Sequence, residues 1–161
     1  MVIMGIDPGF GITGYGLIES DPARLKTPRL IEAGVLTTPK TDPLSDRLHE
    51  IYKGFIGLFQ EFSPSAIALE EIFSVGTFPK SAILIGHVHG IVHLVAAQNG
   101  IPLFMYYPIQ VKRALLGYGR GTKLQMQKMV QRTLSLAAPP RPDDVADALA
   151  VALCHANRAR S

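Results

Sequence analysis

Cysteine and tryptophan are scarce in this 161-residue chain, which has one Cys and no Trp. The single cysteine, Cys154, excludes an internal disulfide and a cysteine-based zinc site. Its neighbours are Ala and Leu at helical spacing, which indicates a core position. The N-terminus lacks a basic segment followed by an apolar stretch, so no secretory signal is expected. No uninterrupted apolar run reaches the roughly 18–20 residues of a membrane span. These absences favour a cytoplasmic protein with no membrane partner.

Charge is also limited, and it is unevenly distributed. Charged residues make up 18% of the sequence and apolar residues 47%, a composition typical of a globular protein rather than a disordered one. Residues 1–100 carry seven Lys and Arg against ten Asp and Glu, whereas residues 101–161 carry nine against three. The basic C-terminal third indicates either a surface that meets a polyanion or a solvated helix face. The length favours a single domain over residues 1–161.

Hydrophobic periodicity predicts five strands and five helices. The expected strands are 2–7, 13–20, 29–38, 65–70 and 101–106. The expected helices are 43–62, 79–98, 108–117, 122–134 and 143–158. Because their connection is short, the first three strands should form an antiparallel meander, whereas the last two alternate with helices and should be parallel. The predicted fold class is α/β, a mixed five-stranded sheet with helices on both faces.

Acidic residues stand at the ends of two expected strands. Asp7 and Glu70 each close an apolar strand, and in open α/β sheets sites form beyond the carboxyl ends of strands. The last helix adds Asp144 and Asp147, which share one helix face, as do Asp143 and Asp147. For Asp143, just after a proline, capping of the helix N-terminus is the favoured interpretation. Asp147 lies too deep in the helix for capping to explain it.

Carboxylates that converge without compensation repel one another, so this pattern indicates divalent cations between them. All-oxygen ligands select hard cations such as Mg²⁺ or Mn²⁺. Two such ions about 4 Å apart can activate a water and stabilise the leaving oxygen of a phosphodiester. The glycines after Asp7 would then let the backbone approach a phosphate closely. The alternative is an ordinary turn between two strands.

The motifs GIDPGFGITGYG, IALEEIF, QVKRALLGYGRGTKLQMQKMV and DDVADALAVALCH follow one another in this chain. Their combination resembles the RuvC family of Holliday-junction resolvases over nearly the whole length. The resemblance implies a ribonuclease H-like fold and a homodimer that makes paired, symmetric nicks in opposite strands of a four-way DNA junction during recombination and repair. It also implies dependence on Mg²⁺, with two ions per subunit and Mn²⁺ as a substitute. A branch-migration motor of the RuvA and RuvB type is the further expected partner.

By position, the resemblance assigns metal binding and catalysis to four acids and adds two active-site lysines. The acids are Asp7, Glu70, Asp144 and Asp147, and the lysines are Lys112 and Lys123. Spacing alone leaves open whether Asp143 or Asp144 is the ligand, and either lysine could be a solvated helix residue. Arg113 and Arg120 of the same basic segment are expected to contact DNA together with the lysines. Gly121 stands where the family has Ala, which is expected to loosen that loop.

Two aromatic residues and one helix complete the expectations. The resemblance implies that Phe73 inserts at the junction, where stacking on a base contributes about 1–3 kcal/mol. A core phenylalanine is the alternative, and Phe78 is a weaker candidate. The helix 79–98 is apolar nearly all round, with Ala82, Gly86 and Gly90 four apart, and the resemblance makes it the dimer interface. Burial within one chain is its alternative, and a zinc pair at His89 and His93 is weak because no third ligand is near.

Three other functions are alternatives to this one. The glycine-rich start also resembles the phosphate-binding turn of sugar kinases and actin-like ATPases, but the chain has no second Asp-Gly turn. Another ribonuclease H-like nuclease, acting on RNA or an RNA–DNA hybrid, is the closer rival. A junction-binding module without catalysis is disfavoured because all four acids are present.

Overall fold

The computed structural model describes residues 1–21, 23, 27–71 and 79–159, and its strands form a mixed sheet. The strands are β1 (Val2–Asp7), β2 (Ile12–Glu19), β3 (Arg29–Thr37), β4 (Ala66–Glu70) and β5 (Leu103–Tyr106). They lie in the order β3-β2-β1-β4-β5. The first three are antiparallel, whereas β4 runs parallel to both β1 and β5. The predicted meander and the parallel pairs are confirmed.

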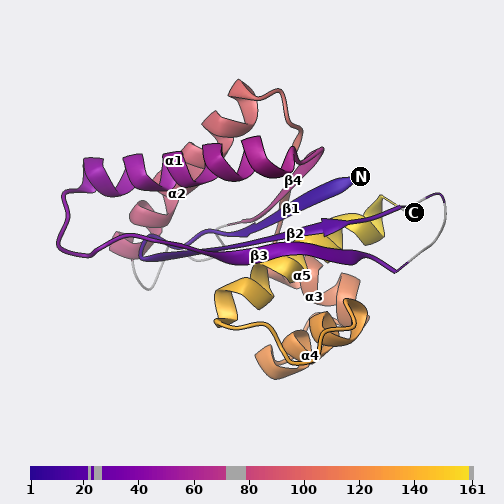
Figure 1. The fold of residues 1–161 in the computed structure, drawn as a ribbon. Coiled ribbons are helices and arrows are strands. Elements are labelled where there is room, and N and C mark those ends of the chain that lie inside the picture. The colour runs from indigo at the N-terminus through magenta and orange to yellow at the C-terminus, as the bar shows by residue number, and fades with distance from the viewer. Residues whose placement is uncertain (22, 24–26, 72–78, 160–161) are drawn as a thin grey trace.

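Helices cover both faces of this sheet, as predicted (Figure 1). They are α1 (Leu44–Phe62), α2 (Pro79–Gln98), α3 (Pro108–Leu116), α4 (Lys123–Thr133) and α5 (Asp143–Arg158). α1 and α2 pack on one face, and α5 lies on the other, with α3 and α4 outside it. α5 is buried along most of its length because it lies between the sheet and these outer helices.

Strand alternation decides which side chains meet which layer. Met4 and Ile6 of β1 belong to the core under α1, where Phe55 is fully buried. Ile3, on the opposite face of the same strand, belongs to the core around α5. Since successive side chains alternate between the faces, Asp7 projects on the α5 side. The sequence of β1 therefore directs its last residue toward the helix that carries the other acids.

α2 is buried along only one side. Val88, Val92 and Val95 are fully buried, whereas the side chains of Ile83 and Leu94 are 63% and 51% exposed. The alternative of burial on most sides within one chain is therefore wrong. Lys80–Gln98 is also long and apolar enough to cross a membrane, but this is weak evidence because core helices meet the same criterion. The exposed apolar side of α2 calls for another explanation.

Candidate active site

The parallel pairing of β1 and β4 brings the first two acids together. Ile6 lies opposite Leu69 in the register, so the strand ends Asp7 and Glu70 follow side by side. Their side chains are hydrogen bonded to each other, and both are partly buried. The two carboxyl groups expected to meet therefore do meet at this edge of the sheet.

Burial and mutual repulsion perturb this pair strongly. Burial, followed by the charge of Glu70, raises the pKa of Asp7 to about 8. Burial also raises the pKa of Glu70, although the hydrogen bond from Asp7 and the charges of Lys123 and Lys112 act in the opposite direction. Burial and mutual repulsion therefore favour one shared proton on the pair near neutral pH. A bound cation would offset the repulsion between the two carboxylates. A site that pairs two carboxyl groups in this way therefore favours cation binding.

Glycines in β1 and β2 let α5 approach the sheet closely enough to add its own acids. A Cβ on Gly14 would overlap the backbone carbonyl of Asp144, and a Cβ on Gly5 would overlap the carbonyl oxygen of Ala148. α5 therefore lies directly on the backbone of these strands. The charges of Asp144 and Asp147 contribute to the raised pKa of Asp7, so both act on the strand pair.

The glycine motif serves a different purpose from the one expected. Gly14 and Gly16 pack against α5, and a Cβ on Gly9 would overlap the carbonyl oxygen of Ile12 within the turn. Of the four glycines that follow Asp7, only Gly11 has open space at its Cβ position. Close helix packing and a tight turn therefore account for three positions, which leaves Gly11 for the expected phosphate approach.

The two predicted active-site lysines reach the acids from α3 and α4. The Nζ atom of Lys123 lies 3.3 Å from Oδ2 of Asp147 and 3.4 Å from Oδ2 of Asp143. Burial alone would lower the pKa of Lys123, but these two carboxylates outweigh it and raise that pKa. The charge of Lys112, on α3, lowers the pKa of Glu70. The positive charges of the lysines therefore act both on the acids at the strand ends and on those of α5.

Asp143 and Asp144 point to different surroundings. Asp143 accepts hydrogen bonds from the side chains of Gln127 and Arg141, at 2.8 and 2.6 Å. Within the described residues no hydrogen bond joins its carboxylate to a helix N–H group, so the capping interpretation is wrong. The charges of both residues raise the pKa of Asp147, but of the two only Asp144 also contributes to the raised pKa of Asp7. This orientation favours Asp144 as the fourth member of the site.

The donor set fits a hard divalent cation, although the acids are not gathered closely. All four side chains offer carboxylate oxygens, which is the chemistry that Mg²⁺ and Mn²⁺ prefer. Within the described ranges, however, no three His, Cys, Asp or Glu side chains form a group ready to hold a metal. The four acids therefore influence one another's charge, as expected, but they do not form a compact cluster. The same finding leaves the weak zinc hypothesis for His89 and His93 without support.

The remaining predicted residues divide into exposed and undescribed ones. Arg113 and Arg120 have exposed side chains on the α3–α4 segment. Phe73 and Phe78 lie outside the described residues. Gly121 is buried, and Leu116 fills the space that an Ala Cβ would occupy. Leu116 therefore occupies the space that the Ala side chain of the family pattern would need, and the expectation of a looser loop stays a prediction.

Sequence reasoning missed two side chains that support the site. Gln127 is 4% exposed, and its position four residues after Lys123 was a signal that both lie on one face of α4. Arg47 of α1 donates to the carbonyl oxygen of Phe10 at 3.1 Å and to Oγ1 of Thr38 at 3.0 Å. Its guanidinium also lies 3.7 Å from the centre of the Phe10 ring, which fixes the loop after Asp7. No local pattern reveals this contact, because 37 residues separate Arg47 from Phe10.

This mixed sheet, with acids at the ends of β1 and β4 and a further pair on α5, defines a ribonuclease H-like protein of the resolvase class. The family model described as crossover junction endodeoxyribonuclease RuvC matches residues 3–155. The chain belongs to the RuvC family.

Individual relatives match over almost their whole length. Crossover junction endodeoxyribonuclease RuvC of Alkaliphilus oremlandii is 45% identical over 157 residues, which cover 98% of this chain and 93% of the relative. The same enzyme of Ruminiclostridium cellulolyticum is 46% identical over 160 residues, covering 99% and 94%. The solved structure of T. thermophilus RuvC in complex with Holliday junction substrate superposes with a TM-score of 0.93. It is 37% identical and covers 99% of this chain and 95% of that one.

Proposed function

We propose that this chain is a crossover junction endodeoxyribonuclease that resolves Holliday junctions by paired, symmetric nicks in opposite strands. Support comes from its membership of the RuvC family and from a relative whose solved structure holds a Holliday junction. The observation that carries the proposal is the adjacent pair Asp7 and Glu70. The charges of Asp144 and Asp147 act on this pair, because both raise the pKa of Asp7. The comparisons do not favour the rival nuclease acting on RNA or an RNA–DNA hybrid.

In this mechanism Asp7, Glu70, Asp144 and Asp147 would hold two Mg²⁺ ions, with Mn²⁺ as a substitute. Bound divalent ions supply an activated water and stabilise the leaving oxygen of the phosphodiester. To become a ligand, Asp7 gives up the proton that it shares with Glu70.

The two lysines act on the substrate. Lys112 and Lys123 place positive charge beside the scissile phosphate, where negative charge increases in the transition state. Both sit close enough to the acids to lower the pKa of Glu70.

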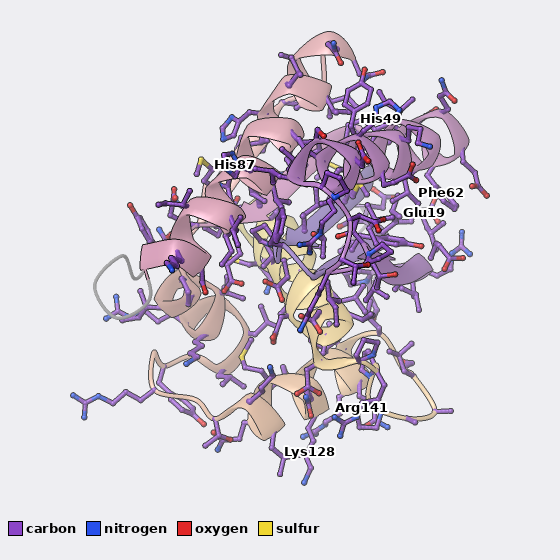
Figure 2. All side chains as sticks on the ribbon, turned by 90° about the vertical axis from the view of Figure 1, so that its left-hand side faces the viewer. Glu19, His49, Phe62, His87, Lys128 and Arg141 are labelled. Atoms are coloured by element: carbon purple, nitrogen blue, oxygen red, sulfur yellow. The ribbon has the colours of Figure 1, made fainter. Side chains whose placement is uncertain are left out.

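DNA contacts are proposed along the basic C-terminal third. Arg113 and Arg120 are exposed beside the lysines, and Phe73 is the proposed stacking residue. Lys128 and Arg141 lie near each other at one end of the molecule, away from His49 of α1 and His87 of α2 (Figure 2). Contacts of this kind with phosphates do not read sequence, so they suit an enzyme that recognises junction shape. In the cell we place the protein in the cytoplasm with a RuvA- and RuvB-type motor.

The exposed side of α2 supports a homodimer. Ala82, Gly86 and Gly90 are at least partly exposed, and the Cβ positions of both glycines face open space. Ile83 and Leu94 add exposed apolar surface to the same helix. Small residues allow a second helix to pack closely, and a two-fold dimer presents two identical sites to two symmetric strands.

Incubation of the purified protein with a synthetic four-way junction and Mg²⁺ tests the proposal. We expect symmetric nicks in the junction and none in linear duplex or in an RNA–DNA hybrid. Asp7→Asn should abolish cleavage while binding, measured in Ca²⁺, is retained. Asp42→Asn, at an exposed acid outside the site, is the matched control and should cut at the normal rate. Persistent nicking by Asp7→Asn would show that Asp7 is not a metal ligand, and cleavage of the hybrid alone would establish the rival function.

A further inference from the structure

The carboxylate of Asp143 is surrounded by side chains of α4 and of the segment before α5. Its Oδ1 atom accepts hydrogen bonds from Nε2 of Gln127 at 2.8 Å and from Nη1 of Arg141 at 2.6 Å. Its Oδ2 atom faces Nζ of Lys123 at 3.4 Å. Each oxygen therefore has a partner of its own, and the two donors to Oδ1 fix how the carboxylate is turned.

The side-chain amide of Gln127 has the most fixed position among the partners of Asp143. Gln127 is 4% exposed, so packing determines the position of its amide. A buried amide without a partner is costly, which stabilises the bond to Asp143. Asp143 itself is partly exposed, and an isolated surface ion pair would contribute little. Here a buried donor, Arg141 and Lys123 share one carboxylate, so the geometry is maintained by a network.

Lys123 lies between two acids that stand four residues apart on one face of α5. Its distances to Asp143 and Asp147 differ by 0.1 Å, 3.4 against 3.3 Å. The lysine side chain is 56% exposed and has a flexible four-carbon stem, so one contact alone would leave its head mobile. Two contacts restrict the ammonium to the edge of the acidic site.

We propose that Asp143 is a positioning residue that holds the ammonium of Lys123 beside Asp147 and the reacting phosphate. This role rests on the proposed function, because only there does Lys123 need a fixed place. If Asp147 gives its oxygens to a cation, Asp143 remains as the partner of Lys123. The orientation of Asp143 toward α4 also separates it from Asp144, whose charge acts on Asp7.

A double-mutant cycle tests the proposal, with Asp143→Asn and Lys123→Met made singly and together. Single-turnover cleavage of a four-way junction is the first readout, and Mn²⁺ binding without DNA, followed by electron paramagnetic resonance, is the second. Asp143→Asn should slow cleavage three- to tenfold when Lys123 is present and less than twofold in the Lys123→Met background. In the Lys123→Met background, adding Asp143→Asn should change the Kd for Mn²⁺ less than twofold.

Three results would overturn it. A tenfold or greater loss of Mn²⁺ affinity on Asp143→Asn in both backgrounds would make Asp143 a metal ligand. Unchanged cleavage with Lys123 present would leave Asp143 without a positioning role. If the unmutated chain does not cut the junction, the proposed function fails; if it cuts but the losses are additive, only the positioning role fails.

A second variant keeps the charges of Asp143 and Lys123 and removes only the buried hydrogen-bond donor to Asp143. Gln127→Met should slow cleavage two- to fivefold without weakening Mn²⁺ binding, because Asp143 can then turn away from Lys123. Gln131→Met, on the same helix and bonded to the carbonyl oxygen of Leu136, is the matched control and should cut within twofold of the normal rate. Equal rates for the two variants would count against the network, and far-ultraviolet circular dichroism checks that each is folded.

Discussion

Replacing Gly14 with alanine should separate α5 from the sheet and disconnect its acids from Asp7. The added Cβ would overlap the carbonyl of Asp144 and lie 3.0 Å from the Cβ atom of that residue. The carbonyl carbon of Asp144 would lie only 2.5 Å from the added Cβ. Because ordinary carbon contacts are about 3.5–4.0 Å, the start of α5 must move by roughly 1–1.5 Å. A misplacement near 1 Å in a catalytic site can lower the rate about 100-fold. Overpacking of this kind costs about 1–3 kcal/mol of stability.

Junction cleavage under single-turnover conditions and thermal unfolding measure the two effects. We expect the cleavage rate of Gly14→Ala to fall about 100-fold, and its Tm to fall by roughly 3–10 °C for a domain of this size. Gly57→Ala is the matched control, because its Cβ faces open space on the exposed face of α1. That variant should keep full activity and gain stability, since Ala favours helix by about 1 kcal/mol. Cleavage by Gly14→Ala within threefold of normal would refute the close-approach argument.

Three further changes test other parts of the molecule. Lys112→Ala should slow cleavage about 100-fold with little loss of junction binding in Ca²⁺, and equal losses in both assays would make Lys112 an ordinary phosphate contact. Leu94→Lys, at a residue that is 51% exposed, should convert the proposed dimer to monomers in light scattering while each chain stays folded by circular dichroism, and an intact dimer would exclude this part of α2 from the interface. Burial lowers the pKa of His155 from its ordinary 6.5, so the unfolded chain takes up a proton more readily and stability is lost as pH falls below about 6.5. The decrease in Tm between pH 7 and 5 should therefore be smaller in His155→Gln, and an equal decrease would contradict this account.

The sheet could be predicted from the sequence because its signals are local. Apolar runs that each close on one acid predicted β1 and β4, and the parallel pairing placed Asp7 beside Glu70 as expected. The periodicity of α5 likewise separated the core positions from the acidic face. These patterns depend on strand and helix geometry alone, which a single sequence displays directly.

The purpose of Gly14 and the partners of Asp143 could not be predicted in this way. Gly14 is needed because α5, 130 residues later in the chain, lies on the backbone of β2. A turn or a phosphate site explains the same glycines equally well when only local sequence is considered. Asp143 has the ordinary position of a helix-capping acid, and its partner Gln127 lies on another helix. Tertiary packing decides both cases.

The acidic site compensates its charge in two separate ways, and both bear on the proposed function. Asp7 and Glu70 share a proton because burial and repulsion make two negative charges unfavourable there. On α5, the positive charge of the Lys123 ammonium offsets the negative charges of Asp147 and Asp143. A divalent cation bound by Asp7, Glu70 and Asp147 would replace both the shared proton and the contact between Lys123 and Asp147. The proton would leave to solvent, whereas Lys123 would stay near Asp143 with its charge available to a phosphate. Metal binding and the delivery of Lys123 to the substrate are then parts of one charge balance.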